Sequence, residues 1–300
     1  MKFSRLELSD AEILRPYFSS VDDEEYGRLC EYSFGSPLLW RELYNIEFCV
    51  EYGALFMRSR LENTARITYS TPMGGVSLAD NIRRLKAYTA SIGEPLLLTS
   101  VSDAALREVL AVCPNGVVTT DPAWYDYLYA AEDLREFAGR KYSKKRNHIN
   151  RFLALYPDWR AETITAANTA DAIAFIEADF AANPKEDYPA YTEGTRMSVD
   201  VLNNLETYGF SGIILYVEGQ AAGVALGETG GDTLYVHTEK ASTEIVGAYQ
   251  ILVREYVRSA GPGIAFVNRE EDDGVPGLRA SKESYFPCAL LKKHSIDCPL

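Results

Sequence analysis

The stretch SGIILYVEGQAAGVALGETGGDTLYVHTEK, residues 211–240, contains three runs rich in aliphatic, aromatic and β-branched residues, separated by glycine-containing turns. Residues of this kind favour strands, and glycine or aspartate between such runs favours turns. The stretch therefore predicts three consecutive antiparallel strands. A helical pattern over residues 246–260 follows, and then come Gly261 and a buried-type strand, IAFVN, at residues 264–268.

The first half of the chain repeats this order. IEFCVEY, ALFMRS and ARITYS, within residues 46–70, predict three strands, and a helix, Gly93 and the strand PLLLTS follow. Gly93 and Gly261 occupy matching places in the two halves, as do Leu96 and Ile264. The helices expected in the first half span residues 10–20, 23–44, 78–92 and 103–112. Those expected around the second block span residues 169–182, 190–208 and 276–285.

The predicted unit is therefore helix–helix, three antiparallel strands, helix, strand, helix, strand. This order is similar to that of N-acetyltransferase-like (GNAT) domains, used twice. We predict a mixed α/β fold of the α+β class with two tandem acetyltransferase-like domains. Residues 1–138 would form the first domain, and residues 139–300 would form the second, which begins with a basic linker helix.

The composition narrows the possible partners and cofactors. A net charge of −13 argues against non-specific binding of nucleic acid or membrane by the whole surface. No secretory signal is visible, and the apolar runs are too short to span a bilayer. The five cysteines contain no CxxC pair, and the three histidines have no HExxH-type spacing. We expect a cytoplasmic protein with no metal, no stable membrane insertion and no sequence-specific DNA binding.

One basic segment contrasts with this acidic chain. GRKYSKKRNHINRF, residues 139–152, carries six basic side chains and no acidic one. At 100° per residue its apolar side chains share one helical stripe, which predicts a helix over residues 142–156. The side chains expected to anchor this helix to the core are Ile149, Phe152 and Leu153.

The cations of this helix fall into two groups. Lys144, Asn147 and Arg151 lie on the polar face, whereas Lys145 and Arg146 flank the apolar stripe. A cation beside a buried face incurs a desolvation cost unless an anion is close. We therefore predict that Lys145 and Arg146 reach a cleft between the domains and help to bind an anionic substrate. The alternative is a solvated linker helix with no ligand.

Two stretches resemble a known family. WYDYLYAAEDLREFAGRKYSKKRNHINRF, residues 124–152, resembles the central signature of a bacterial family related to the C-terminal catalytic domain of phosphatidylglycerol lysyltransferase. NREEDDGVPGLRASKESYFP, residues 268–287, resembles the C-terminal signature of the same family. The positions matched in the second stretch are Asn268, Glu270, Asp272, Gly274, Leu278, Arg279, Lys282 and Pro287.

The resemblance implies an acyl or aminoacyl transferase. The better-known relatives transfer an aminoacyl group from charged tRNA to a lipid or a peptidoglycan precursor. We expect no counterpart of the lysyltransferase's membrane-spanning half in this chain, which makes a lipid acceptor less expected. A charged tRNA end or another small anionic substrate would suit the basic segment, because phosphate neutralisation dominates such affinity.

The tail stretch supplies further candidate residues. Pro276 suits the first turn of a helix, with Asp272 in the capping region before it. Tyr285 resembles the tyrosine that many acetyltransferase-like enzymes use as general acid, so Tyr285 and Asp272 are the candidate catalytic residues. Further candidate substrate-binding residues are Asn268, Arg279 and Lys282. The alternatives are core packing for Tyr285 and a solvated helix face for Arg279 and Lys282.

Two donors of the transferred group fit the sequence: aminoacyl-tRNA and acyl-CoA. In acetyltransferase-like folds, backbone N–H groups at a helix N-terminus hold the donor's pyrophosphate. Gly247 and Ala248 stand at that place as weak candidate cofactor-binding residues, but Glu244 occupies the position of the usual cation. A CoA-dependent N-acetyltransferase is therefore the second enzyme hypothesis. A non-catalytic anion-binding protein with the same fold is the third.

Overall fold

The computed structural model describes residues 1–19, 26–60, 66–182 and 189–300, and the chain forms two compact units. Unit 1 comprises Met1–Tyr127, Glu270–Arg279 and Leu290–Leu300. Unit 2 comprises Leu128–Arg269 and Ala280–Ala289. Within the described residues, no helix combines the length and apolarity that crossing a membrane requires.

The units differ from the single boundary that the sequence predicts between residues 138 and 139. Two late segments belong to unit 1, and the second of them contains the last strand, β15 (His294–Cys298), which pairs with strands of that unit on both sides. Ile296 of β15 lies opposite Leu98 on one neighbour and Val118 on the other. Hydrogen bonding within the sheet thus brings the end of the chain back to its first half.

The sheet of unit 1 has the strand order β1-β2-β3-β4-β6-β15-β7, and β5 pairs with β3. Its other strands are β1 (Ser4–Arg5), β2 (Glu47–Glu51), β3 (Ala54–Arg60), β4 (Ile67–Ser70), β5 (Met73–Gly74), β6 (Leu96–Val101) and β7 (Val117–Thr120). The helices of unit 1 are α1 (Ala11–Phe18), α3 (Gly35–Trp40), α4 (Leu78–Ser91) and α5 (Asp103–Val112), with 3-10 turns at Leu8–Asp10, Cys30–Tyr32 and Pro122–Trp124.

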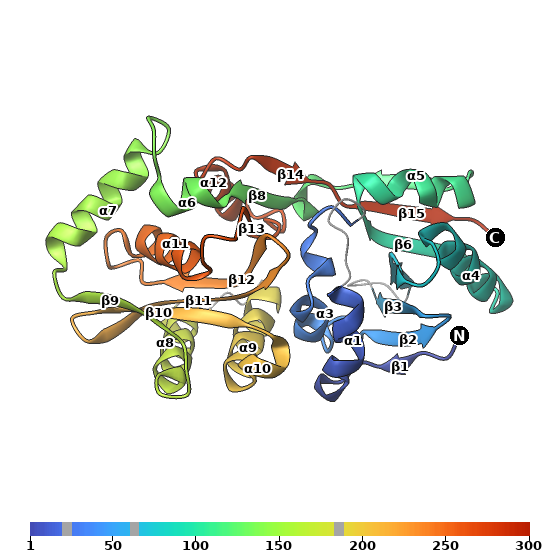
Figure 1. Ribbon diagram of the computed structural model, residues 1–300, viewed down its shortest axis with the longest axis horizontal. Helices are drawn as coiled ribbons and strands as arrows, with labels where there is room; N and C mark the ends of the chain where they lie inside the picture. The colour runs from blue at the N-terminus through green and yellow to red at the C-terminus, as the bar shows by residue number, and fades with distance from the viewer. Residues whose placement is uncertain (20–25, 61–65, 183–188) are drawn as a thin grey trace. The chain divides into compact units, whose positions relative to one another are not determined.

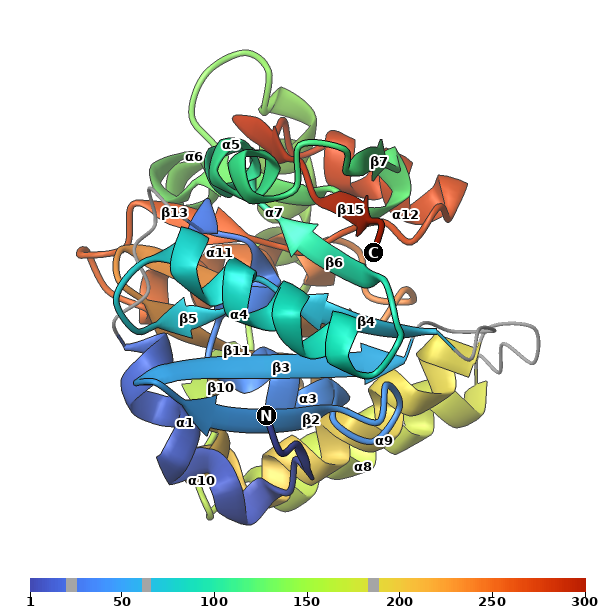
Figure 2. The same cartoon turned by 90° about the vertical axis from the view of Figure 1, so that its right-hand side faces the viewer.

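The core of unit 1 lies between its sheet and two helices. Helix α4 begins after Ser77, whose hydroxyl accepts a hydrogen bond from the Asp80 N–H, as expected of an N-cap. Its apolar side chains Ile82 and Leu85 are buried in one cluster with Leu98 and with residues of α5. Figure 2 shows α4 lying across one face of this sheet.

The sheet of unit 2 has the order β14-β8-β13-β12-β11-β10-β9. Its strands are β8 (Asp126–Ala130), β9 (Trp159–Thr163), β10 (Ser211–Val217), β11 (Gln220–Gly230), β12 (Thr233–Ala241), β13 (Phe266–Asn268) and β14 (Ala289–Leu291). The helices of unit 2 are α6 (Ala131–Glu136), α7 (Ser143–Leu155), α8 (Thr169–Ala182), α9 (Pro189–Asn203), α10 (Leu205–Tyr208) and α11 (Ala248–Ser259), and α12 (Pro276–Glu283) begins in the residues of unit 1 and ends in those of unit 2. Figure 1 shows α8, α9 and α10 on one face of this sheet and α11 on the other.

The two units repeat one pattern of pairing. In unit 1, β2, β3 and β4 pair antiparallel, and β6 then pairs parallel to β4 after helix α4. In unit 2, β10, β11 and β12 pair antiparallel, and β13 pairs parallel to β12 after helix α11. The predicted α+β class with two acetyltransferase-like units is confirmed.

Two predicted helices differ from the structure. The segment expected to form one helix over 23–44 is not a continuous helix in its described part, because Gly27 and Arg28 take positive φ values that interrupt helices, and a 3-10 turn and the short helix α3 follow. The helix expected over 190–208 is divided at Asn204 into α9 and α10. Positions 20, 23–25 and 65 of the predicted elements lie outside the described residues.

The basic segment forms α7, in agreement with the prediction of a helix over 142–156. Ile149 and Phe152 are buried as predicted, but Leu153 is 39% exposed and does not anchor the helix. Phe152 packs against Tyr156 and Trp159, and Leu153 lies 100° further round the helix, away from that contact. The buried stripe is therefore narrower than the sequence pattern indicates.

Replacing Ile296 with alanine tests whether β15 belongs to the core of unit 1. Ile296 is fully buried, so Ile296→Ala should lower the free energy of unfolding by about 2–5 kcal/mol. Leu290→Ala, at a side chain that is 48% exposed, is the control and should change it by less than about 0.5 kcal/mol. Urea denaturation measures both, and equal effects would contradict the placement of β15.

Candidate functional site

The candidate site of unit 2 lies where β12 and β13 stop pairing. Their parallel ladder joins Thr233–Tyr235 to Phe266–Asn268, and β12 then continues to Ala241 without a β13 partner. A β-bulge interrupts β12 at His237, because Leu226 of β11 faces Thr238 whereas Gly227 faces Val236. Bulges re-aim side chains and are frequent beside functional sites.

Arg269 directly follows β13, and its side chain connects the end of β13 to the part of β12 that has no β13 partner. Its guanidinium NH2 donates to Glu239 Oε1 at 2.7 Å, and the two side chains are only 10% and 11% exposed. The guanidinium carbon lies 4.6 Å from the ring centre of Tyr285. NH1 of Arg269 is buried and has no hydrogen-bond partner among the described residues. The sequence analysis did not single out Arg269 or Glu239 as a pair.

Tyr285 is 2% exposed, and its hydroxyl accepts a hydrogen bond but donates none to a described residue. Gln250 Nε2 donates to it at 3.4 Å, and no described residue accepts the hydroxyl's own proton. Burial raises the pKa of Tyr285, although the charge of Arg269 opposes this. The hydroxyl therefore stays protonated near neutral pH and can donate a hydrogen bond or a proton.

Lys145 of α7 covers the same ring. Its ammonium lies 3.5 Å from the ring centre of Tyr285 and donates to Ser284 Oγ at 2.7 Å. Burial lowers the pKa of Lys145 to about 8, with the positive charge of Arg269 adding to this and Glu239 opposing it. Within the described residues no carboxylate forms an ion pair with Lys145.

Two further predicted residues support this arrangement. Lys282 is 8% exposed, and its Nζ donates to the Arg269 carbonyl at 2.6 Å. Asn268 is fully buried and is the last residue of β13, opposite Tyr235. Both residues therefore hold the chain on either side of Arg269 rather than present donors at the surface.

The remaining residues of the basic helix lie elsewhere. Lys144, Asn147 and Arg151 are exposed. Arg146 is engaged within unit 2, because its NH1 donates to the carbonyl of Phe137 and, at 2.6 Å, to that of Gly139. Arg146 thus secures the end of α6, where Phe137 takes a left-handed conformation, and only Lys145 of the two flanking cations meets Tyr285.

Asp272 and Arg279 lie together in unit 1, whereas Tyr285 lies in unit 2. Asp272 is fully buried and accepts from Nε and NH2 of Arg279, at 2.7 and 2.9 Å, and from the Tyr127 hydroxyl at 2.6 Å. Burial alone would raise the pKa of Asp272, but these hydrogen bonds lower it below its ordinary value. The carboxylate is ionised and fully engaged in holding the turn before α12.

Gly247 has a packing role that accounts for its identity. It precedes α11 with φ +84°, and a Cβ there would lie 2.5 Å from the His148 carbonyl oxygen of α7. Ala248 is buried at the first position of α11. The close approach of α7 explains the glycine without a bound pyrophosphate, and Glu244 is exposed nearby in the sequence.

His237 occupies the bulge of β12 but is paired. Its Nε2 lies 3.0 Å from Glu228 Oε1 of β11, and its ring stacks on Phe210 with centres 4.7 Å apart. The neighbouring Thr238 shares a hydrogen bond of 2.8 Å with Ser198 of α9. These contacts give His237 a structural role within the sheet and its packing.

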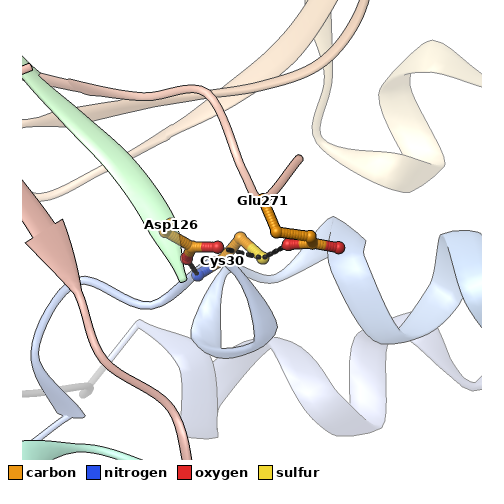
Figure 3. Close-up of side chains that lie close together, drawn as sticks. All are labelled: Cys30, Asp126 and Glu271. Atoms are coloured by element: carbon orange, nitrogen blue, oxygen red, sulfur yellow. Dashed lines mark hydrogen bonds between the residues drawn. The ribbon is translucent and has the colours of Figure 1, made fainter. Parts of the chain in front are cut away.

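Unit 1 contains a buried polar cluster that the sequence analysis missed. The backbone N–H of Cys30 donates to Asp126 at 2.8 Å, and its thiol lies 3.6 Å from Asp126 and 3.9 Å from Glu271, as Figure 3 shows. The ligand atoms of these three residues lie within 4.8 Å of one another, which is close enough to share a metal ion. Their separation in the sequence gave no motif to recognise.

Lys293 supplies a cation to this cluster. Its Nζ lies 2.7 Å from Asp126, 2.9 Å from Glu31, 3.0 Å from Glu271 and 3.4 Å from the Cys30 sulfur. A metal ion among the same atoms would face the ammonium at close range, so the donor set does not fit one. Burial raises the pKa of Asp126 to about 7, with Lys293 opposing and Glu31 adding to the shift.

Comparisons with known proteins agree with this fold. The family described as phosphatidylglycerol lysyltransferase, C-terminal, matches residues 26–295. A conserved protein of unknown function from Bacteroides thetaiotaomicron is similar with 28% identity and a TM-score of 0.91, over 99% of each chain. No curated protein sequence matches.

Two solved structures with lower identity share the fold. One is the C-terminal domain of a protein described as a lysylphosphatidylglycerol synthetase from Agrobacterium fabrum, with 11% identity, a TM-score of 0.67, and 96% of this chain and 91% of that chain covered. The other is L-PGS from Bacillus licheniformis, with 14% identity, a TM-score of 0.64, and coverage of 97% and 92%.

The Lys293 cluster predicts a pH-dependent loss of stability. Lys293→Met leaves buried carboxylates without their cation, which should lower the free energy of unfolding by about 3–5 kcal/mol at pH 8. Asp126 has a raised pKa in the folded state, so the stability it contributes is lost as pH rises from about 4 to about 7. Removing the ammonium raises that pKa further, and the loss should therefore be smaller at pH 5 than at pH 8.

Urea denaturation of wild type and variant at the two pH values measures this difference. Lys292→Met removes the same charge from the exposed neighbouring residue and serves as the control. A loss no larger than that of the control would show that the cluster does not depend on Lys293, and an equal loss at both pH values would contradict the predicted link to the titration of Asp126.

Proposed function

The chain belongs to the phosphatidylglycerol lysyltransferase C-terminal family, and we therefore propose that it transfers an acyl or aminoacyl group to an amine or hydroxyl acceptor. The relatives named after lysylphosphatidylglycerol synthesis point to the aminoacyl form of this reaction. We propose a charged tRNA end as the donor, with its anionic part near the basic helix α7.

The observation that carries the proposal is the state of the Tyr285 hydroxyl. It is buried and protonated, and its own proton has no acceptor among the described residues. Transfer from an ester needs a group that protonates the leaving oxygen and donors that stabilise the developing oxyanion. Tyr285 would supply the proton, and the nearby ammonium of Lys145 would stabilise negative charge.

The same geometry favours aminoacyl-tRNA over acyl-CoA as donor. A pyrophosphate at the start of α11 would need open backbone N–H groups, but the backbone of α7 closely approaches Gly247 there. Glu244, in the preceding loop, adds an acidic side chain where a cation would be expected. A CoA-dependent N-acetyltransferase therefore ranks second.

A non-catalytic anion-binding protein is the alternative from another class. The observation that favours it is that Lys145 and Arg269 both cover the Tyr285 ring, which is 2% exposed. A tyrosine so enclosed can hold these two cations without taking part in a reaction. Kinetics of a variant that lacks only the hydroxyl separates the two functions.

Calorimetry tests the choice of donor. We expect acetyl-CoA to bind weakly or not at all, since α7 closely approaches Gly247 at the start of α11 and Glu244 stands where a cation would be expected. A micromolar dissociation constant for acetyl-CoA would contradict this and favour the acetyltransferase.

Tyr285→Phe tests the transfer itself. The wild-type protein should discharge labelled aminoacyl-tRNA when supplied with phospholipid and amine acceptors, and the variant should lower kcat by about 100-fold or more. Its melting temperature should change little, because the hydroxyl makes only the long hydrogen bond to Gln250.

Tyr216→Phe is the matched control. It removes a hydroxyl bonded to Asp171 of α8, on the other face of the sheet from α11, and should leave kcat unchanged. Transfer by Tyr285→Phe at the wild-type rate would exclude Tyr285 as the acid. No discharge by wild type with any acceptor would favour the non-catalytic alternative.

A further inference from the structure

Arg269 carries a buried donor that forms no hydrogen bond with any described residue. NH2 of its guanidinium donates to Glu239, but the buried NH1 has no hydrogen-bond partner among the described residues. The side chain is 10% exposed, so bulk water does not readily replace a missing partner. Buried polar groups are nearly always paired, and an orphaned one calls for a partner such as a ligand.

A second cation lies beside this donor. The Lys145 ammonium and the Arg269 guanidinium are 3.5 and 4.6 Å from the ring centre of Tyr285. The positive charge of Arg269 acts on Lys145, and the carboxylate whose charge acts on both is that of Glu239. The group of three thus carries one more positive than negative charge.

The other polar groups named beside the two cations are uncharged or form a hydrogen bond to another group. Ser284 and Gln250 contribute uncharged polar groups, and Lys282 points its ammonium at the Arg269 carbonyl. Two like charges held together at low exposure repel each other and lose hydration. A single negative charge placed between them would relieve both costs.

We propose that Arg269 NH1 and the Lys145 ammonium form a binding site for one singly charged oxyanion, a carboxylate or a phosphodiester, on the substrate of this protein. Both donors can make charge-assisted hydrogen bonds, the strongest kind available to an oxyanion. The site rests on the proposed function only in taking the anion to be part of the substrate. Binding of the anion alone requires no transfer.

The position of Lys145 gives the site a characteristic pH response. The anion binds the charged form of Lys145, whose pKa is about 8 in its absence because of burial and the nearby Arg269. Affinity should therefore fall as pH rises through that value, and bound anion should shift the titration of Lys145 upward. The charged groups that act on Lys145 are Arg269 and Glu239, and Tyr285, whose ring also faces it, keeps its proton across this range because burial raises its pKa.

The experiment titrates the full-length protein with dimethyl phosphate and, separately, with acetate, at constant ionic strength and at pH 7 and 9.5. Binding is followed by NMR of the lysine side chains. We expect one or both anions to bind wild type at pH 7, at least tenfold more weakly at pH 9.5, and at least tenfold more weakly to Lys145→Ala. Which anion binds more tightly identifies the substrate group as a phosphodiester or a carboxylate.

Two further variants separate binding at this site from a general effect of positive charge and from loss of folding. Arg140→Ala removes an exposed charge from the same basic segment and should bind like wild type. Arg269→Lys keeps a cation for Glu239 but lacks the second guanidinium nitrogen, so it should fold and bind at least tenfold more weakly. Absence of binding to wild type, or equal binding by Lys145→Ala and Arg140→Ala, would overturn the site.

These outcomes are separable from those for the proposed function. Anion binding that depends on Lys145 in a protein without transfer activity would keep the site and reject the transferase. Transfer activity without such binding would reject the site alone.

Discussion

The buried ion pair between Arg269 and Glu239 is the interaction on which the candidate site depends. It joins the end of β13 to the part of β12 that has no β13 partner. Such a pair adds little net stability compared with apolar packing, but breaking it is costly because one charge stays buried without its partner. Its consequence is mainly positional, since it holds the guanidinium against Tyr285 with NH1 unused.

In unit 1, buried charges connect segments that are far apart in the sequence. Glu271 and Lys293 belong to the two segments that return to this unit late in the chain, whereas Cys30 and Asp126 belong to its first part. The ammonium of Lys293 lies within hydrogen-bond distance of both carboxylates. Electrostatic attachment and the pairing of β15 thus act together to hold a discontinuous unit.

The repeated order of strands and helices was predictable because alternation, turn glycines and helical periodicity are local signals. The bulge at His237 was not, since it depends on how β11 and β12 pair. Periodicity placed Lys145 and Arg146 equally beside the apolar stripe, and only tertiary packing separates them: Lys145 meets an aromatic ring, and Arg146 meets backbone carbonyls. The tail signature contains Asp272 and Tyr285 within one short stretch, yet they belong to different units. The sequence pattern did not predict a role for Arg269, because its partner Glu239 is thirty residues away and only the fold brings the two side chains together.

The titration of the Lys145 side chain in the unliganded protein tests directly whether Lys145 and Arg269 form a buried pair of cations. Assigned NMR signals of its terminal methylene report the charge of the ammonium, and we expect a midpoint near pH 8, caused by burial and by Arg269. In Tyr285→Phe the midpoint should stay low, because the ring and both cations remain. A midpoint near the ordinary lysine value of about 10.5 would mean that Lys145 is solvated and separate from Arg269, and the two-cation site would not exist.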